Sequence, residues 1–319
     1  MKKKRIIKWL IGIVIVLLTI NSLVGVFFYN LVIKRGPKDF LQNNTDLEVE
    51  PEILGEFING DWVMWTKGQR FEEIQMTSFD DLNLKGYYLP AKEKSKKLVV
   101  FAHGYLGEAK DMGFFGQYYY EELGFNLFTP DFRGHGESEG DYYGFGWPDR
   151  LDIIEWLNLL IEKEGKDVEI VLHGLSMGAS ALLMASGEEL PEQVKFIVAD
   201  SPYTSVYDMF AYQMKRMYNL PDKPILPTLS LVTKLRADYS LTEASTIKQV
   251  KKATLPILYI HGVEDTFVPT HMALKLSDQT ASDYEVLTIE GAGHGESYIL
   301  EKKAYQNKLN EYIERYIEN

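Results

Sequence analysis

The amino-acid sequence contains no cysteine, so the chain can form neither a disulfide nor a thiolate metal site. Export remains possible, because disulfides outside the cytosol are an option and not a requirement. The His-Glu-x-x-His spacing of a zinc site is also missing. Gly134, Gly136 and Gly140 do not form the dinucleotide-binding fingerprint, and no glycine-rich loop ends in the lysine that binds phosphates. We therefore expect no metal site and no cofactor.

Charge is absent from Trp9 to Ile33, a run of 25 positions. At about 1.5 Å per residue such a helix crosses a hydrocarbon core of about 30 Å, so we predict a single-pass membrane anchor over residues 9–33. The basic residues before the run are Lys2, Lys3, Lys4, Arg5 and Lys8, and those after it are Lys34 and Arg35. This bias predicts a cytoplasmic N-terminus and an extracellular domain, as on a Gram-positive surface. The alternative is a secreted protein with a cleaved signal peptide, whose apolar part would have about 7–15 residues before an Ala-x-Ala-like site.

Acidic side chains dominate the rest of the chain. Residues 1–35 hold seven of the 34 Lys and Arg residues and no acid, which leaves 27 basic against 46 acidic residues, a formal charge of −19. Such a chain will not bind nucleic acid or acidic lipid by bulk electrostatics. We predict a basic stub and anchor over 1–35, a stalk or linker over 36–70 with a short amphipathic segment, and one large domain over 71–319.

Strand and helix patterns alternate through this domain. Period-two alternation at 73–77 and 82–89 predicts a hairpin. Continuous apolar runs predict buried strands at 97–102, 125–129, 170–172 and 194–199, and further strands follow at 256–262 and 284–289. Helical stretches are expected at 109–123, 149–164 and 298–317. This alternation implies parallel strands with right-handed crossovers.

Ser176 lies where an apolar strand changes into a small-residue helical stretch. Gly174 and Gly178 flank it two positions away on each side, where a sharp strand-to-helix turn leaves no space for a Cβ. Such a turn exposes the serine at a helix N-terminus, so the amide of Met177 faces any oxyanion formed beside its hydroxyl. We interpret Ser176 as a nucleophile; the alternative is a plain glycine-rich turn.

The loop after the run 97–102 begins with His103, Gly104 and Tyr105. Its backbone can present the amide of Tyr105 toward Ser176, and with the amide of Met177 this would make an oxyanion hole. We interpret His103 as a structural histidine that fixes the loop by hydrogen bonds.

Three motifs, in this order along the chain, resemble the α/β-hydrolase superfamily. They are the His103-Gly104 loop, the segment Asp131-Phe132-Arg133-Gly134-His135-Gly136-Glu137-Ser138, and Gly174-Leu175-Ser176-Met177-Gly178. More narrowly, they resemble its serine aminopeptidase-like and Bem46-like branch, loosely called lysophospholipase-like. The resemblance covers about residues 72–319 and implies an α/β fold with a mostly parallel central sheet and helices on both faces. It also implies that the segment from Asp131 to Ser138 is a structural turn, so Asp131, His135 and Ser138 are not expected to be catalytic.

Asp265 and His294 complete the predicted site. Each follows a predicted strand, as Ser176 does, and ligands of parallel sheets gather at the carboxyl ends of the strands. The order serine, aspartate, histidine is the one that this fold uses. His294 would take the serine proton, and Asp265 would hold the His294 tautomer. Other polar residues are expected to play lesser parts: Glu264 and Asp200 as alternative acids, Glu296 solvated, and His261 and His271 structural or on the surface.

Residues 203–238 break the alternation, because aromatic and methionine side chains crowd the stretch and three prolines follow. We predict a small helical cap over the site, in which Tyr203, Tyr207 and Phe210 line an apolar acyl pocket. The alternative is that these side chains fill the cap's own core.

These interpretations predict a membrane-anchored serine hydrolase that cleaves carboxylic esters through an acyl-enzyme. Its partners would be a small-molecule ester or acyl substrate and the membrane, and not nucleic acid; the oligomeric state stays open. A peptidase or amidase with the same triad is the main alternative, followed by an acyltransferase and an inactive binding module.

Overall fold

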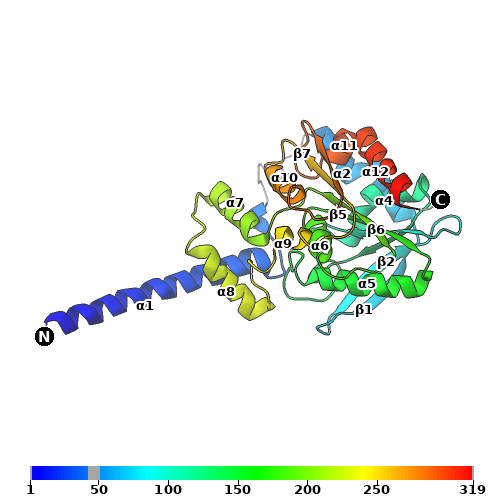
Figure 1. The fold of residues 1–319 in the computed structure, drawn as a ribbon. Helices are drawn as coiled ribbons and strands as arrows, with labels where there is room; N and C mark the ends of the chain where they lie inside the picture. Colours follow the sequence, from blue (N-terminus) through cyan, green and yellow to red (C-terminus); the bar gives the residue numbers. More distant parts are fainter. Residues whose placement is uncertain (1, 42–50, 318–319) are drawn as a thin grey trace.

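A computed structural model describes residues 2–41 and 51–317 of the chain. Its centre is an eight-stranded sheet in the order β1-β2-β4-β3-β5-β6-β7-β8 (Figure 1). β1 (Glu72–Thr77) and β2 (Asn83–Leu89) form the expected antiparallel hairpin, β2 pairs antiparallel with β4 (Asn126–Pro130), and the other neighbours are parallel. The remaining strands are β3 (Lys97–Ala102), β5 (Glu169–Leu175), β6 (Val194–Asp200), β7 (Ile257–Gly262) and β8 (Tyr284–Ile289).

The carboxyl ends of the parallel strands lie level with one another. Gly174 of β5 pairs with Ala102 of β3 on one side and with Ala199 of β6 on the other. Gly262 of β7 likewise pairs with Ile289 of β8. The loops after these strands therefore begin at one edge of the sheet, where ligand sites form in sheets of this type.

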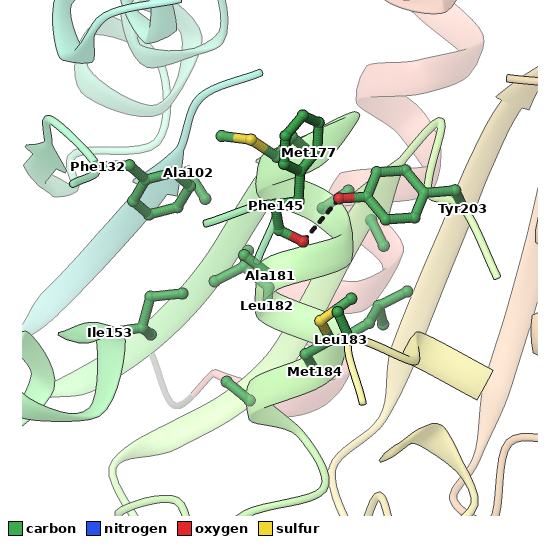
Figure 2. Packing of buried hydrophobic residues seen from close by; sticks show 14 of the residues in the cluster. Ala102, Phe132, Phe145, Ile153, Met177, Ala181, Leu182, Leu183, Met184 and Tyr203 are labelled. Atoms are coloured by element: carbon green, nitrogen blue, oxygen red, sulfur yellow. Dashed lines mark hydrogen bonds between the residues drawn. The ribbon is translucent and has the colours of Figure 1, made fainter. Parts of the chain in front are cut away.

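Helices cover both faces of the sheet. Side chains alternate along a strand, so Val100 of β3 faces one hydrophobic cluster while its neighbours Val99 and Phe101 face the other. α5 (Asp149–Glu164) and α6 (Met177–Ala185) close the first cluster, and α4 (Gly113–Glu121) and α12 (Lys302–Tyr316) close the second. Figure 2 shows the packing around α6. The shorter helices are η4 (Ala109–Met112), α9 (Thr246–Val250), α10 (His271–Ser277) and α11 (Ser297–Leu300).

The N-terminal helix α1 (Lys2–Phe28) extends away from the domain and continues into a π-helical turn, η1 (Tyr29–Ile33) (Figure 1). Within residues 2–41 and 51–317, the stretch Lys3–Ile33 is the one helix long and apolar enough to cross a membrane, by length and composition. Its side chains are exposed as far as Ile20, whereas Phe28, Tyr29 and Ile33 are buried against the domain. The end of this helix is therefore part of the domain's core.

The described parts of the segment 36–70 differ from the stalk that we expected. η2 (Asp39–Leu41) follows η1, and α2 (Pro51–Asn59) and α3 (Asp61–Gly68) lie on the domain. Residues 42–50 of the expected linker lie outside the described residues. The rings of Phe57 and Trp62 lie 5.4 and 5.9 Å from the ring of Phe114 on α4. Burial of these aromatic side chains holds α2 and α3 against the domain.

The segment 203–238 contains two helices, α7 (Val206–Tyr218) and α8 (Ile225–Ala237). Ser205 caps α7 by accepting a hydrogen bond from the Asp208 N–H (3.0 Å), and Asn219 ends it in the left-handed conformation. Both helices lie beside the end of α1 (Figure 1).

Candidate active site

Ser176 lies in the sharp turn between β5 and α6, with φ 55° and ψ −113°. This conformation is strained for a residue that carries a Cβ. The flanking glycines make the turn possible, because a Cβ on Gly174 would lie 2.6 Å from the Ala179 nitrogen and one on Gly178 would lie 2.0 Å from the Ala102 carbonyl oxygen. The chain is therefore held in a strained turn that presents the Ser176 hydroxyl at the start of α6.

The Ser176 hydroxyl belongs to a chain of hydrogen bonds that joins three loops. Its Oγ lies 2.9 Å from Nε2 of His294, and Nδ1 of His294 lies 2.7 Å from Oδ2 of Asp265. Asp265 follows β7 and His294 follows β8, so adjacent strand ends bring them to the serine. Because the Asp265 carboxylate can only accept, Nδ1 donates to it and Nε2 is left to accept the serine proton.

Charge and burial oppose each other in this pair. Burial raises the pKa of Asp265, but the charge of His294 and hydrogen bonds from His261 and His294 outweigh it and hold that pKa below its usual range. Burial lowers the pKa of His294, but the charge and hydrogen bond of Asp265 outweigh it and raise that pKa above the ordinary value of 6.5. His294 is therefore a stronger base than free imidazole, and Asp265 stays ionised at neutral pH.

The two alternative acids lie in different settings. Glu264 is exposed. Asp200 is buried, its Oδ1 accepts a hydrogen bond from the Ser201 hydroxyl (3.0 Å), and burial raises its pKa to about 6. Among the described residues, no hydrogen bond joins either carboxylate to His294, so the geometry selects Asp265.

Glu296 is buried, in contrast to the solvated position that we expected. Its Oε2 accepts a hydrogen bond from the N–H of Gly293 (2.7 Å), next to His294. The side chain thus supports the histidine loop. Only the folded chain shows this, because a glutamate in a glycine-rich loop is ordinarily exposed.

His261 is buried at the end of β7, and its Nε2 lies 2.7 Å from the Val268 carbonyl oxygen and 3.1 Å from Oδ2 of Asp265. It is a structural residue that also contacts the triad acid. His271 is exposed at the start of α10, as a surface residue.

The two amides proposed for the oxyanion hole belong to segments that flank Ser176. Met177 is the first residue of α6, so its N–H has no acceptor within the helix. A Cβ on Gly104 would lie 3.7 Å from that of Ser176, which shows how closely the loop of Tyr105 approaches Ser176. That distance is an ordinary contact, so packing alone does not require glycine at 104. Both Tyr105 and Met177 line the cavity beside Ser176.

His103 and the segment after β4 hold the loops in place. The Phe132 N–H donates to Nε2 of His103 (3.0 Å). Nδ1 of His103 is therefore the protonated nitrogen and donates to the Gly104 carbonyl (2.8 Å). The Asp131 carboxylate accepts hydrogen bonds from the N–H groups of Ala109 and Glu137 (2.7 and 2.9 Å). These contacts make the segment a structural turn, in agreement with the resemblance.

An apolar cavity adjoins Ser176, and Tyr203 and Phe210 line it. The Tyr203 hydroxyl donates to the Phe145 carbonyl (2.8 Å), as Figure 2 shows. Tyr207 is not among the described lining residues; its hydroxyl donates to the Asp222 carboxylate (3.0 Å) inside the cap. Of the three expected pocket residues, Tyr203 and Phe210 therefore line the cavity, whereas Tyr207 forms a hydrogen bond within the cap.

Part of the cavity wall comes from residues that the sequence did not assign to the site. They belong to the end of α1, to η1 and to η2, and are Phe28, Leu31, Val32, Phe40 and Leu41. The length of the uncharged run could have indicated that some of these residues belong to the domain. The run has 25 residues, and a membrane span requires roughly 20.

A second hollow reaches the triad from another side. Ser176 and His294 line it together with Phe57 and Trp62 of α2 and α3 and with the acid Asp111. Ser176 therefore lines both an apolar cavity and a largely aromatic hollow that also contains the carboxyl group of Asp111.

A sequence profile of the alpha/beta hydrolase family matches residues 99–304, which include all three triad positions. The chain belongs to the alpha/beta hydrolase family. This confirms the resemblance inferred from the motifs, and the mixed, mostly parallel sheet agrees with it.

The chain is also similar to several relatives and, in its fold, to solved structures. The chain is 27% identical over 314 residues to the uncharacterized protein YqkD of Bacillus subtilis, over 94% of this chain and 97% of that protein. It is 24% identical to human alpha/beta hydrolase domain-containing protein 17B, over 73% and 71% of the two chains. The Pyrococcus furiosus esterase Pf2001 superposes with a TM-score of 0.62 at 22% identity, over 82% and 96%. The Pyrococcus horikoshii acylaminoacyl peptidase superposes with a TM-score of 0.59 at 18% identity, over 80% of this chain and 43% of that one.

Proposed function

We propose that the protein is a serine hydrolase that cleaves carboxylic esters through an acyl-enzyme, without a cofactor. One observation carries the proposal, the chain of hydrogen bonds from Ser176 through His294 to Asp265. A serine hydroxyl is a poor nucleophile near neutral pH and needs a base within hydrogen-bond reach. The 2.9 Å contact between Ser176 and His294 supplies that base.

The reaction has two halves. In the first, Oγ of Ser176 bonds to the substrate carbonyl carbon while its proton passes to Nε2 of His294, and Asp265 stabilises the imidazolium. The ester C–O bond then breaks, and His294 gives the proton to the leaving alkoxide, which departs as an alcohol. In the second half, a water gives a proton to Nε2 of His294 and bonds to the acyl carbon. The bond between the acyl carbon and Oγ then breaks, His294 returns the proton to Oγ of Ser176, and the carboxylic acid leaves.

The amides of Tyr105 and Met177 would hold the oxygen that becomes negative in each half. Donors of this kind are worth about 3 kcal/mol each in comparable sites. The strained turn at Ser176 supports this role, because it holds the nucleophile at the positive end of α6.

The two hollows beside Ser176 suggest how an ester would lie. The acyl group fits the apolar cavity, and the alcohol fits the hollow lined by Phe57, Trp62 and Asp111. The apolar lining favours an acyl chain over a polar peptide segment, because buried peptide groups without hydrogen-bond partners are costly.

A panel of chromogenic substrates tests the reaction class. The full-length protein is expected to hydrolyse p-nitrophenyl esters, with kcat/KM rising as the acyl chain lengthens, and to cleave aminoacyl-anilides at least about a hundredfold more slowly. Faster turnover of anilides would make it a peptidase or amidase. Transfer of the acyl group to an added alcohol in preference to water would make it an acyltransferase. Turnover of neither substrate, together with no labelling by a fluorophosphonate, would leave a binding module.

We also propose that α1 is retained and anchors the protein in the cell membrane, with the domain outside. The exposed apolar side chains up to Ile20 suit a lipid environment, and the basic residues before them suit the cytoplasmic side. Phe28, Tyr29 and Ile33 are buried in the domain. Cleavage after this segment would remove core side chains, which favours an anchor over a signal peptide.

The absence of cysteine allows a direct test of this topology, because one introduced cysteine is the only thiol in the chain. In intact cells of a Gram-positive host, a membrane-impermeant maleimide is expected to label Glu290→Cys, at an exposed position after β8, and not Lys3→Cys. Labelling of both variants after lysis is the control. The reverse pattern in intact cells would invert the topology, and release of a shortened Glu290→Cys protein into the medium would show a cleaved signal.

A further inference from the structure

The anchor and the cap meet along a defined line. The Asn21 side chain hydrogen-bonds to Thr228 of α8, and the Arg236 guanidinium lies over the Tyr29 ring at 5.2 Å from its centre. The two residues of each pair are separated by 207 positions in the sequence. Because the separation is the same at both contacts, α8 lies beside residues 21–29 and runs in the same direction. Figure 1 shows α8 in this place.

The apolar cavity beside Ser176 lies where the anchor, the cap and the loop His103-Gly104-Tyr105, here called the oxyanion loop, meet. Leu31 and Val32 line it from the anchor side. The Val32 carbonyl accepts a hydrogen bond from the Tyr105 hydroxyl (2.7 Å), which ties this wall to the oxyanion loop. The Phe28 ring lies 6.3 Å from that of Tyr218 and ties the wall to α7. The end of the anchor is thus a fixed part of the cavity.

The outer face of α8 is suited to contact with lipid. Pro227, Leu231 and Leu235 are exposed at a four-residue spacing, and 77% of Leu235 is accessible. The loop before α8 carries Asp222 and Lys223, so this tip of the cap belongs in the headgroup layer and not in the hydrocarbon core. Positions on α1 are exposed up to Ile20, and the first partly buried one is Asn21. This change coincides with the contact between α1 and α8 at Asn21.

We infer that the end of the anchor and the cap together form one acyl-chain site, which takes the chain of an ester-linked lipid from the leaflet around α1. The chemistry rests on the proposed function, but the site does not, because residues other than Ser176 form almost all of its wall and Asp265 and His294 are not part of it. Ser176 and the end of α1 line the same apolar cavity, so an acyl chain that enters beside α1 from that leaflet would reach Ser176 through apolar surroundings. The anchor is therefore a determinant of substrate choice as well as of location.

Filling the cavity from the anchor side tests the site. In the full-length protein in detergent micelles, Leu31→Trp is expected to lower kcat/KM for p-nitrophenyl dodecanoate about tenfold or more, and that for p-nitrophenyl butyrate less than twofold. Leu18→Trp, the same substitution at an exposed position of α1, is the control and should change neither value. A second variant, Leu31→Ala, should also lower the dodecanoate-to-butyrate ratio by loosening the wall. An unchanged ratio in both Leu31 variants would overturn the inference, and the ratio does not depend on how much protein folds.

A binding measurement separates this inference from the proposed function. A fluorescent dodecanoic acid is expected to bind the Ser176→Ala protein, and about tenfold more weakly when Leu31→Trp is added, whatever the protein hydrolyses. If no ester is turned over but this binding persists, the proposed function fails and the acyl-chain site stands. If binding is insensitive to Leu31→Trp, the site fails.

The source of the lipid is tested in vesicles of neutral phosphatidylcholine. A long-chain fluorogenic ester carried in the same vesicles as the protein is expected to be hydrolysed at least about tenfold faster than the same ester in separate vesicles. Equal rates would show that the substrate arrives through water, which would overturn the membrane route.

Discussion

Ser176→Ala is expected to lower kcat on p-nitrophenyl esters by about 10⁶-fold and to abolish covalent labelling by a fluorophosphonate. The Ser176 Oγ is the atom that hydrogen-bonds to His294, and among the described residues no other hydroxyl takes its place in the chain of contacts to Asp265. The remaining rate would come from substrate binding and the oxyanion donors alone.

Folding should change little in this variant. Alanine retains the Cβ, so the strain at φ 55° is the same, and the main change is one lost hydrogen bond at the edge of a cavity. A melting temperature within a few degrees of the wild type is therefore expected. Because the triad acts as a unit, adding His294→Ala to Ser176→Ala should cause almost no further loss.

Ser186→Ala is the matched control, since Ser186 ends the same helix and its hydroxyl bonds to a backbone carbonyl instead of a triad residue. It should label and turn over as the wild type does. Equal labelling of wild type and Ser176→Ala would remove Ser176 as the nucleophile and would require another serine.

The nucleophile turn and the strand pattern were predictable because each depends on local chemistry. The two glycines within two residues of Ser176 indicate that other backbone segments pass too close for a Cβ. The structure has these close contacts at both glycines. Asp265 and His294 could be placed because each follows a strand, and parallel strands end at one edge. The family confirms the fold that this pattern implies.

The residues that sequence reasoning missed depend on long-range packing. Glu296 lies in a glycine-rich loop, and only its hydrogen bond with the Gly293 N–H shows why a charged side chain is buried there. Leu31 lies in an apolar run whose composition is the same whether lipid or protein covers it. Tyr207 and Phe210 are both aromatic and close in sequence, yet one bonds to Asp222 and the other faces the cavity. Periodicity indicates that a side chain is covered, but not by what.

Asp265→Asn is expected to lower kcat at neutral pH by about 10⁴-fold with little loss of folded protein. The asparagine amide can donate to Nδ1 of His294, which favours the tautomer with its proton on Nε2. That tautomer cannot accept the proton of Ser176, although the ring stays near its present position. The variant thus separates the role of the carboxylate's charge from that of its shape.

The pH profile gives a second reading of the same variant. His294 must be neutral to act as a base, and its pKa is raised above 6.5 in the wild type, so the acid limb of kcat/KM is expected above pH 6.5. The raised pKa of His294 in the wild type depends on the charge and hydrogen bond of Asp265. Without them burial dominates and lowers the pKa of His294, so the remaining activity of Asp265→Asn should have its acid limb at lower pH.

Two further variants decide between the possible acids. Glu264→Gln changes the exposed neighbour of Asp265 and should alter kcat less than twofold. Asp200→Asn removes a carboxylate that is buried but is not hydrogen-bonded to His294 in the described chain, so its loss should be far smaller than that of Asp265→Asn and should leave the acid limb above pH 6.5. The assignment fails if Asp265→Asn keeps kcat within tenfold of the wild type while Asp200→Asn loses it. In that case, the hydrogen bond between His294 and Asp265 would be a feature of the resting enzyme, and the ring would have to turn toward Asp200 during the reaction.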